Sequence, residues 1–336
     1  MLGGLLAICS AATFAFNNAS VRRGVLSGSV GQAMAITVPL GVPLFFLAAL
    51  ATGHLGDVFG FPFRGLAALS LAGILHFVWG RYCNYRATSA IGTNLVAPVQ
   101  NLNLIVTLSL AIWLLGEQLT PLRILGIGLI LLGPSLTVRA KANEPSGGDG
   151  SEEKETAGKA EMAAFKPRYA EGYLFALLSA TGYGLSPILV RVGLENKGIG
   201  TSLAGGLVAY VAATGVMVLI LMWPGNFRNA LAVDRGAARW FTLSGFLVFL
   251  SQMFLYMAMS VAPVTVVSPI NRLSILFRLY FSRWLNPKHE VFGGSVIVGT
   301  VVSLLGAVTL SMSTEVVQSI VPLSDGVIAL LNWHWP

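Results

Sequence analysis

The chain has 336 residues, of which 55% are hydrophobic and only 10% are charged, and its mean hydropathy is +0.74. Soluble domains are about one-quarter charged, so this composition excludes an ordinary soluble protein and indicates a polytopic membrane protein. The net charge of +7 does not imply a nucleic-acid partner, because the basic residues lie mostly in loops beside apolar stretches. Membrane topology explains such a distribution.

The N-terminal stretch is apolar from the start, with no charged segment and no small-residue cleavage site after it. We therefore predict that residues 2–21 are a retained first span and not a signal peptide. Cys9 and Cys83 lie in apolar segments without metal-ligand spacing. We expect neither a disulfide nor a metal or other cofactor.

Apolar stretches that supply the roughly 20 residues needed to cross a bilayer recur along the chain. They predict an all-α integral membrane protein with ten transmembrane helices, near 2–21, 30–52, 65–86, 90–115, 121–138, 171–190, 202–224, 238–258, 262–285 and 292–312. Residues 139–170 are charged and rich in Gly and Ser, which is typical of a hydrophilic linker. Residues 313–336 form a short tail.

The two halves, 2–138 and 171–312, repeat each other at a nearly constant offset. The matching pairs include Ser10 and Ser179, Gly24 and Gly193, Tyr85 and Tyr256, Pro98 and Pro269, Trp113 and Trp284, and Glu117 and Glu290. Because five spans is an odd number, the second copy must be inverted relative to the first. Two inverted five-helix repeats around a central cavity are typical of transporters that work by alternating access.

Charges in the middle of the predicted spans are all positive. Arg272 and Arg278 lie midway along the ninth span and Arg81 lies in the third, whereas no acidic residue falls in the middle of a span. A charge near the bilayer centre costs at least ~2.5 kcal/mol, so each arginine needs a neutralising partner. An anionic ligand is one such partner. Backbone carbonyls and water are the alternative, or snorkelling of Arg81 to the surface.

Helical spacing places further polar residues beside these arginines. Asn271, Ser274, Arg278 and Ser282 form a stripe on the ninth span. The fourth span carries Gln100, Asn103 and Thr107 at equivalent positions, and Asn101 corresponds to Arg272. The stripes predict a lined cavity, although hydrogen bonds that hold the helices together would give the same pattern.

Other candidates are less specific. Asn17 on the first span could extend the cavity, and His76 on the third could relay protons, although structural packing explains both. Trp79 and Tyr256 are packing residues by default that could also touch substrate. Pro98 and Pro269 open or kink equivalent helices and are predicted hinges.

The two-times-five layout, the Gly-Glu-Gln-Leu-Thr-Pro ending of the fourth span and the Gly-x-x-Leu-Ile-Leu-Leu-Gly pattern of the fifth resemble the EamA family of the drug/metabolite transporter superfamily. The resemblance covers 2–138 and 171–312 and implies a transporter fold. Its relatives move amino acids, sugar phosphates, nucleotide sugars and small drugs, so it names no ligand. The second half departs from the pattern at Asn286-Pro287-Lys288, which replaces the Gly-Glu turn.

These observations predict a secondary transporter, an exporter or exchanger, of a small organic anion. Arg272 and Arg278 would bind the anion, and Asn101, Gln100 and Asn103 would orient it. The alternatives are export of neutral or zwitterionic amino acids or small drugs and, from another class, a non-transporting membrane receptor. An enzyme is disfavoured because acidic, His and Cys side chains do not cluster.

The expected location is the cell (inner or plasma) membrane. Lys and Arg residues gather on the side that carries the linker, which places 139–170 in the cytoplasm by the positive-inside rule. Relatives usually have the opposite orientation. The sequence leaves a homodimer open.

Overall fold

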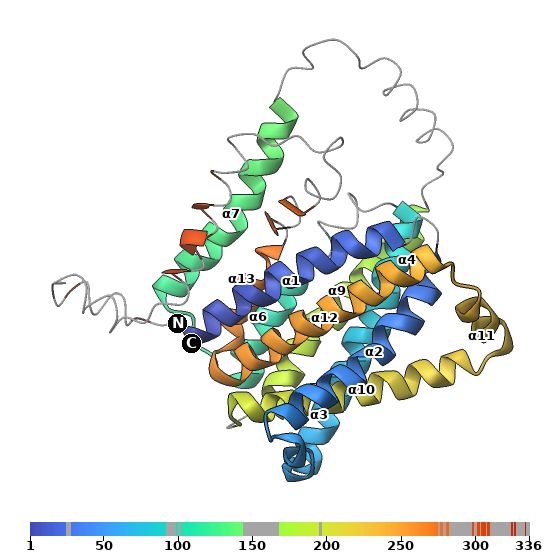
Figure 1. Ribbon diagram of the computed structural model, residues 1–336. Helices are drawn as coiled ribbons and strands as arrows, with labels where there is room; N and C mark the ends of the chain where they lie inside the picture. Colours follow the sequence, from blue (N-terminus) through green and yellow to red (C-terminus); the bar gives the residue numbers. More distant parts are fainter. Residues whose placement is uncertain are drawn as a thin grey trace.

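The computed structural model describes most of both halves of the chain. The described residues are 1–24, 28–91, 99, 102–143, 168–194, 197–274, 276–277, 280–281, 298, 301–302, 304–306, 308–309, 324, 326 and 333. Within them the regular elements are all helices, and most pack side by side, whereas the helix Pro121–Asn143 stands at one side of the others (Figure 1).

The helices follow the predicted spans closely. In the first half they are α1 (Leu2–Gly24), α2 (Val30–Ala51), the 3-10 helix η1 (Leu55–Gly60), α3 (Phe63–Gly73), the π-helix η2 (Ile74–Gly80), α4 (Arg81–Ile91), α6 (Leu102–Leu115) and α7 (Pro121–Asn143). In the second half they are α9 (Tyr169–Gly193), α10 (Ile199–Leu221), α11 (Pro224–Leu231), α12 (Arg235–Val261) and α13 (Val264–Asn271).

Six helical segments are long and apolar enough to cross a membrane: Leu2–Val21, Val30–Ala51, Phe63–Ala87, Tyr169–Gly193, Ile199–Leu221 and Arg235–Val261. They correspond to the first three predicted spans of each half. The apolar helices Leu102–Leu115 and Pro121–Leu132 are shorter. The start of the predicted fourth span, much of the ninth and most of the tenth lie outside the described residues, so the number of ten stays a prediction.

The two halves are joined by exchanged contacts. The first helix of each half packs against the third segment of the other: α1 lies along α12, and α9 lies against α3, η2 and α4 (Figure 1). The helix ends show the same exchange, because Gly24 lies against the ring of Phe241 and Gly193 lies against Leu69. A Cβ atom at either glycine would overlap these side chains, so the glycines set how closely the helices approach.

Hydroxyl groups make the matching contacts further along the same helices. Ser251 Oγ on α12 donates to the Ser10 carbonyl on α1 at 3.0 Å. Ser179 Oγ on α9 donates to the Gly80 carbonyl at the end of η2, also at 3.0 Å. Such bonds hold helices together in lipid, where the hydrophobic effect supplies little attraction between them.

The second helices of the two halves, α2 and α10, pack on each other in the interior. Phe45 on α2 and Tyr210 on α10 form an aromatic cluster with Phe249 on α12 and Phe77 on η2. Phe45 is 5.2 Å from Tyr210 and 4.9 Å from Phe249, and Phe77 is 4.1 Å from Tyr210, measured between ring centroids. These four rings are buried.

Candidate functional site

The central feature of the site is a break in the ninth predicted span. Helix α13 begins after Pro263, contains Pro269 and ends at Asn271. Arg272 and Leu273 form a turn, after which the described residues are helical again: Ser274, Leu276, Phe277, Tyr280 and Phe281. The sequence predicts one continuous helix over 262–285. Beyond Pro269 the backbone bonds tighten: Arg272 N donates to Pro269 O at 2.9 Å, and Leu273 N donates to Ile270 O at 3.0 Å. A proline removes one helical donor and crowds the turn before it, so the effect of Pro269 falls within α13 and the tightened turn at Arg272 and Leu273 comes after it.

The broken end of α13 carries Arg272 toward α6. Its guanidinium donates a hydrogen bond to Asn103 Oδ1, and Asn103 is itself buried. One turn further along α6, Thr107 Oγ1 donates to the carbonyl of Gly184 on α9 at 3.0 Å. Of the predicted fourth-span residues, Asn103 therefore meets the predicted arginine directly.

On the other side of α13, Asn271 faces α1. Ser10 Oγ lies 3.5 Å from Asn271 Oδ1, to which it donates, and 3.3 Å from Ser251 Oγ on α12. Ser10 and Ser251 are fully buried or nearly so. Helices from both halves, α1, α6 and α12, thus bring polar side chains to the two sides of α13.

Within the described part of the chain, Arg272 has no carboxylate partner. The ion pairs seen there, His54 with Asp57 and Glu171 with both Arg86 and Arg168, are partly exposed. Arg272 instead has an amide oxygen as its partner. A neutral acceptor leaves the charge of a guanidinium uncompensated in a low-dielectric setting.

Arg81 is the second interior cation. Its side chain is 8% exposed, donates from Nη1 to Thr37 Oγ1 at 2.9 Å and lies 5.7 Å from the centre of the Phe77 ring. It therefore stays inside the bundle and does not extend to the surface. Thr37 was not singled out in the sequence because nothing there marks α2 as the neighbour of the third span.

His76 lies on the π-helix and packs in the interior. Its ring is 4.9 Å from that of Tyr183 on α9, and its Nε2 is 3.5 Å from Nε2 of Gln252 on α12. Gln252 was missed from the sequence, although it stands at the same offset from Arg81 as Tyr256 does from Tyr85. A role for His76 as a proton relay stays a prediction.

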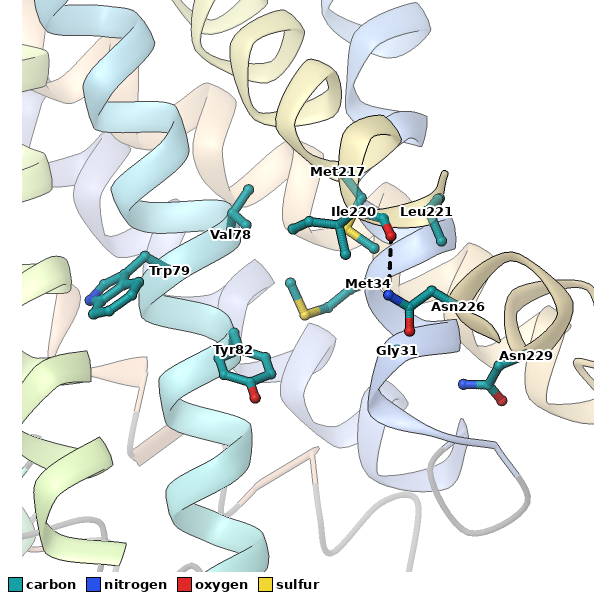
Figure 2. Close-up of a pocket in the computed structure, with 10 residues that line it drawn as sticks. All are labelled: Gly31, Met34, Val78, Trp79, Tyr82, Met217, Ile220, Leu221, Asn226 and Asn229. Atoms are coloured by element: carbon teal, nitrogen blue, oxygen red, sulfur yellow. Dashed lines mark hydrogen bonds between the residues drawn. The ribbon is translucent and has the colours of Figure 1, made fainter. Parts of the chain in front are cut away.

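The other predicted residues lie apart from the Arg272 contacts. Asn17 accepts a 2.5 Å hydrogen bond from Ser244 Oγ and so ties α1 to α12. Tyr256 is buried with its ring 6.3 Å from that of Phe45. Trp79 lines a separate pocket beside Tyr82 (Figure 2). Arg278, Asn101, Gln100 and Pro98 lie outside the described residues.

Glu117 has a structural role that the sequence did not reveal. Its Oε1 accepts from Val264 N and its Oε2 from Thr265 N, both at 2.8 Å. The carboxylate of the first half thus caps the positive end of α13 in the second half. Arg123 adds a bond from Nη1 to Thr265 Oγ1 at 3.4 Å. In the sequence, the pairing of Glu117 with Glu290 between the two repeats marked this residue, but it did not indicate that the carboxylate caps a helix.

Comparison with known proteins gives a family and a fold. The model of the EamA-like transporter family matches residues 1–139 and 170–312. A search of curated proteins finds no match. A solved structure titled "Crystal structure of protein" superposes with a TM-score of 0.64 at 18% identity, covering 92% of this chain and 95% of the other. At that identity the superposition supports the fold alone.

Proposed function

Because the chain belongs to the EamA-like transporter family, we propose that it is a secondary transporter that exports or exchanges a small organic anion by alternating access. The observation that carries the proposal is the position of Arg272. It lies at the break in α13, bonds to Asn103 of the other half, and has no carboxylate partner among the described residues.

The chemistry of the site suits a carboxylate or a phosphate ester. A guanidinium offers several N–H donors in a planar fork that matches two oxygens of such a group. An incoming anion would take over the donors that Arg272 now gives to Asn103. The freed Asn103 amide would then hydrogen-bond another part of the substrate. Broken helices beside a midplane site are typical of secondary transporters.

The exchanged contacts between the halves support an inverted-repeat arrangement. The contact of Gly24 with Phe241 is equivalent to that of Gly193 with Leu69. In each, a glycine at the end of the first helix of one half lies against the third segment of the other half. Such pairs are expected when two copies are related by a two-fold axis in the membrane plane.

Alternating access requires contacts that seal each end of the pathway in turn. The bonds from Glu117 to α13 join the halves at the end where α6 finishes. The bond between Ser244 and Asn17 joins them toward the opposite end. We assign these two contacts as the seals. The excess of Lys and Arg on the linker side supports a cell-membrane protein with residues 139–170 on the cytoplasmic side.

Uptake into proteoliposomes tests the function. The purified chain would be offered labelled carboxylates, phosphate esters, neutral amino acids and organic cations. We expect anion uptake, with a KM that rises roughly 10- to 100-fold in Arg272→Ala, because a hydrogen bond to a charged group contributes about 1.5–3 kcal/mol. The exposed Arg64 supplies the matched control, since Arg64→Ala removes a cation outside the site. Uptake of cations alone, unchanged in Arg272→Ala, would refute the proposal.

A further inference from the structure

A cavity lies between α2, the η2–α4 segment, α10 and α11, and the contacts of Arg272 are not part of its lining. It has a volume of about 430 Å³ and is mostly apolar (Figure 2). Ten residues line it: Gly31, Met34, Val78, Trp79, Tyr82, Met217, Ile220, Leu221, Asn226 and Asn229. Its size falls in the range of sites that hold small ligands.

The open side of this cavity faces the surroundings of the bundle. Met34, Val78 and Met217 form a buried floor, whereas Trp79, Tyr82 and Ile220 are exposed. These exposed side chains belong to segments that are long and apolar enough to span the membrane. A molecule that enters between them therefore comes from the hydrocarbon region of the bilayer.

Helix α11 bounds the cavity at its polar end and has the character of an interfacial helix. Trp223, Phe227 and Leu231 recur every fourth residue and are 75%, 54% and 69% exposed, which makes one apolar stripe on the outside. A short helix with such a stripe, placed between two spans, lies in the headgroup region. Tryptophan is enriched at that depth.

Hydrogen bonds hold α11 against the start of α2. Gln32 Nε2 donates to the Asn229 carbonyl at 2.8 Å, and Asn229 Nδ2 donates to Ser29 Oγ at 3.3 Å. Asn226 Nδ2 donates to the Ile220 carbonyl at 3.0 Å, so α11 is also tied to α10 (Figure 2). The polar end of the cavity is thus a fixed wall, with the exposed Arg228 on the same helix.

We propose that this cavity binds one acyl chain of a membrane glycerophospholipid. The chain lies on Met34, Val78 and Met217, and the phosphate and glycerol groups lie at α11, near Asn226 and Arg228. Three features select a lipid: the opening lies between membrane-spanning segments, the floor is apolar, and the polar rim sits at headgroup depth. The cavity shares no lining residue with the contacts of Arg272, so the inference does not depend on the transported substrate.

Photo-crosslinking in proteoliposomes tests the proposal. The full chain is reconstituted with a phospholipid that carries a diazirine midway along one acyl chain, irradiated, digested and mapped by mass spectrometry. We expect labels on the peptides that contain Met34, Val78 and Met217. Ile220→Trp fills the mouth and should lower this labelling about tenfold, the factor for a loss of 1.4 kcal/mol. Leu219→Trp, one residue away on the exposed face of α10 and outside the cavity, is the matched control and should label as the unaltered chain does.

Three results would overturn the proposal. One is equal labelling in Ile220→Trp and Leu219→Trp, and another is labelling spread evenly over the outer face of the bundle. The third is displacement of the probe by the carboxylates or phosphate esters of the uptake assay, which would mean that the cavity binds water-soluble anions and not an acyl chain. Met34→Phe fills the floor without a new polar group and replaces Ile220→Trp if that variant does not fold. It should lower the labelling in the same way.

Discussion

The third segment of the first half consists of α3, η2 and α4, and its counterpart in the second half is α12. The two segments make matching contacts, each with the half to which it does not belong. Gly73 lies against the backbone of Ala209 on α10, and Gly245 lies against Leu40 on α2. At their next contacts, the Gly80 carbonyl accepts from Ser179, and Ser251 donates to the carbonyl of Ser10. Yet α12 is one α-helix, whereas the other segment is interrupted by a π-helix.

The difference comes from one residue. Gly73 is separated from Gly80 by one residue more than Gly245 is from Ser251. A π-turn takes up one extra residue while the helix on either side keeps its phase, and such turns are frequent at functional sites. In this protein the π-helix carries His76 and Trp79 and is followed at once by Arg81. The first half thus keeps its contacts with α9 and α10 and also presents side chains that α12 lacks.

The strongest test of this comparison deletes one residue from each segment. Deleting Leu250 from α12 rotates one flank by about 100° relative to the other, because α12 has no extra residue to give up. We expect a loss of stability above about 4 kcal/mol, or no folded protein. Deleting Leu75 from η2 converts the π-turn to an α-turn and leaves both flanks in phase. We expect that variant to fold with a loss below about 2 kcal/mol.

Thermal unfolding in detergent, with the folded fraction monitored by size-exclusion chromatography, measures the loss of stability in both deletion variants. Equal losses in the two deletions would show that the π-helix does not absorb an added residue. The Leu75 deletion should still impair transport, because it moves His76 relative to Arg81.

We expect a smaller difference in stability between alanine substitutions at Gly73 and at Gly245. A Cβ atom at Gly73 would overlap the carbonyl group of Ala209, which is backbone and cannot turn aside. At Gly245 the nearest atom is Leu40 Cδ2, 2.7 Å away at the end of a flexible side chain. We expect Gly73→Ala to cost about 3 kcal/mol and Gly245→Ala about 1 kcal/mol, as overpacking does. Both variants gain the same helix propensity, so the difference in unfolding temperature reports the contact alone.

The sequence predicted the helices well because long apolar stretches decide membrane spans locally. Predicted and observed ends of the first span of each half agree within three residues, at 2–21 against Leu2–Gly24 and 171–190 against Tyr169–Gly193. The repeat was also readable, since paired residues such as Ser10 and Ser179 keep their order. The π-helix was not predicted, because one extra residue looks like any other small insertion until both flanks are fixed by contacts.

The site was predictable in part. Arg272 and Asn103 were selected as interior polar residues, and the structure brings them together. The partners on α2 and α12, Thr37 and Gln252, were not found, because which helices pack together is a property of the whole bundle. The Glu117 cap was missed for the same reason: its acceptor role exists only where α6 of one half meets α13 of the other.

Arg81 provides a functional comparison of the two segments, since its counterpart on α12 is Gln252. Arg81→Gln makes the two segments alike at this point. We expect stability to change by less than about 1 kcal/mol, because removing a buried charge offsets the lost hydrogen bond. Thr37 keeps its bond to the Ala33 carbonyl at 2.8 Å. Anion uptake should show a KM about tenfold higher, the result of losing roughly 1.4 kcal/mol of attraction.

The exposed Arg239 on α12 provides the control for this variant. Arg239→Gln removes the same charge outside the interior and should leave KM unchanged. An equal change in both variants would mean that overall charge, and not the position of Arg81, governs uptake.

The smallest expected effect concerns the two connections that follow the second helices, η1 in the first half and α11 in the second. Each docks on the start of the opposite half's second helix, but η1 does so through a carboxylate. Asp57 Oδ2 accepts from Thr201 Oγ1 at 2.6 Å and lies 2.9 Å from His54 Nδ1. The bond from Thr201, followed by that to His54, lowers the pKa of Asp57 below its ordinary 3.8. The docking of α11 uses only neutral groups, Ser29, Gln32 and Asn229.

A lowered pKa in the folded state means that the Asp57 contribution is fully present above about pH 3.8 and is lost as the pH falls through the lower, folded value. Acidification below that point should therefore loosen η1 and leave α11 in place. Limited proteolysis by an acid-active protease, mapped at both connections, measures this, and in Asp57→Asn the η1 cleavage should no longer depend on pH. Equal loosening of α11 over the same range would show that acid acts on the bundle as a whole, and that the carboxylate does not distinguish the two halves.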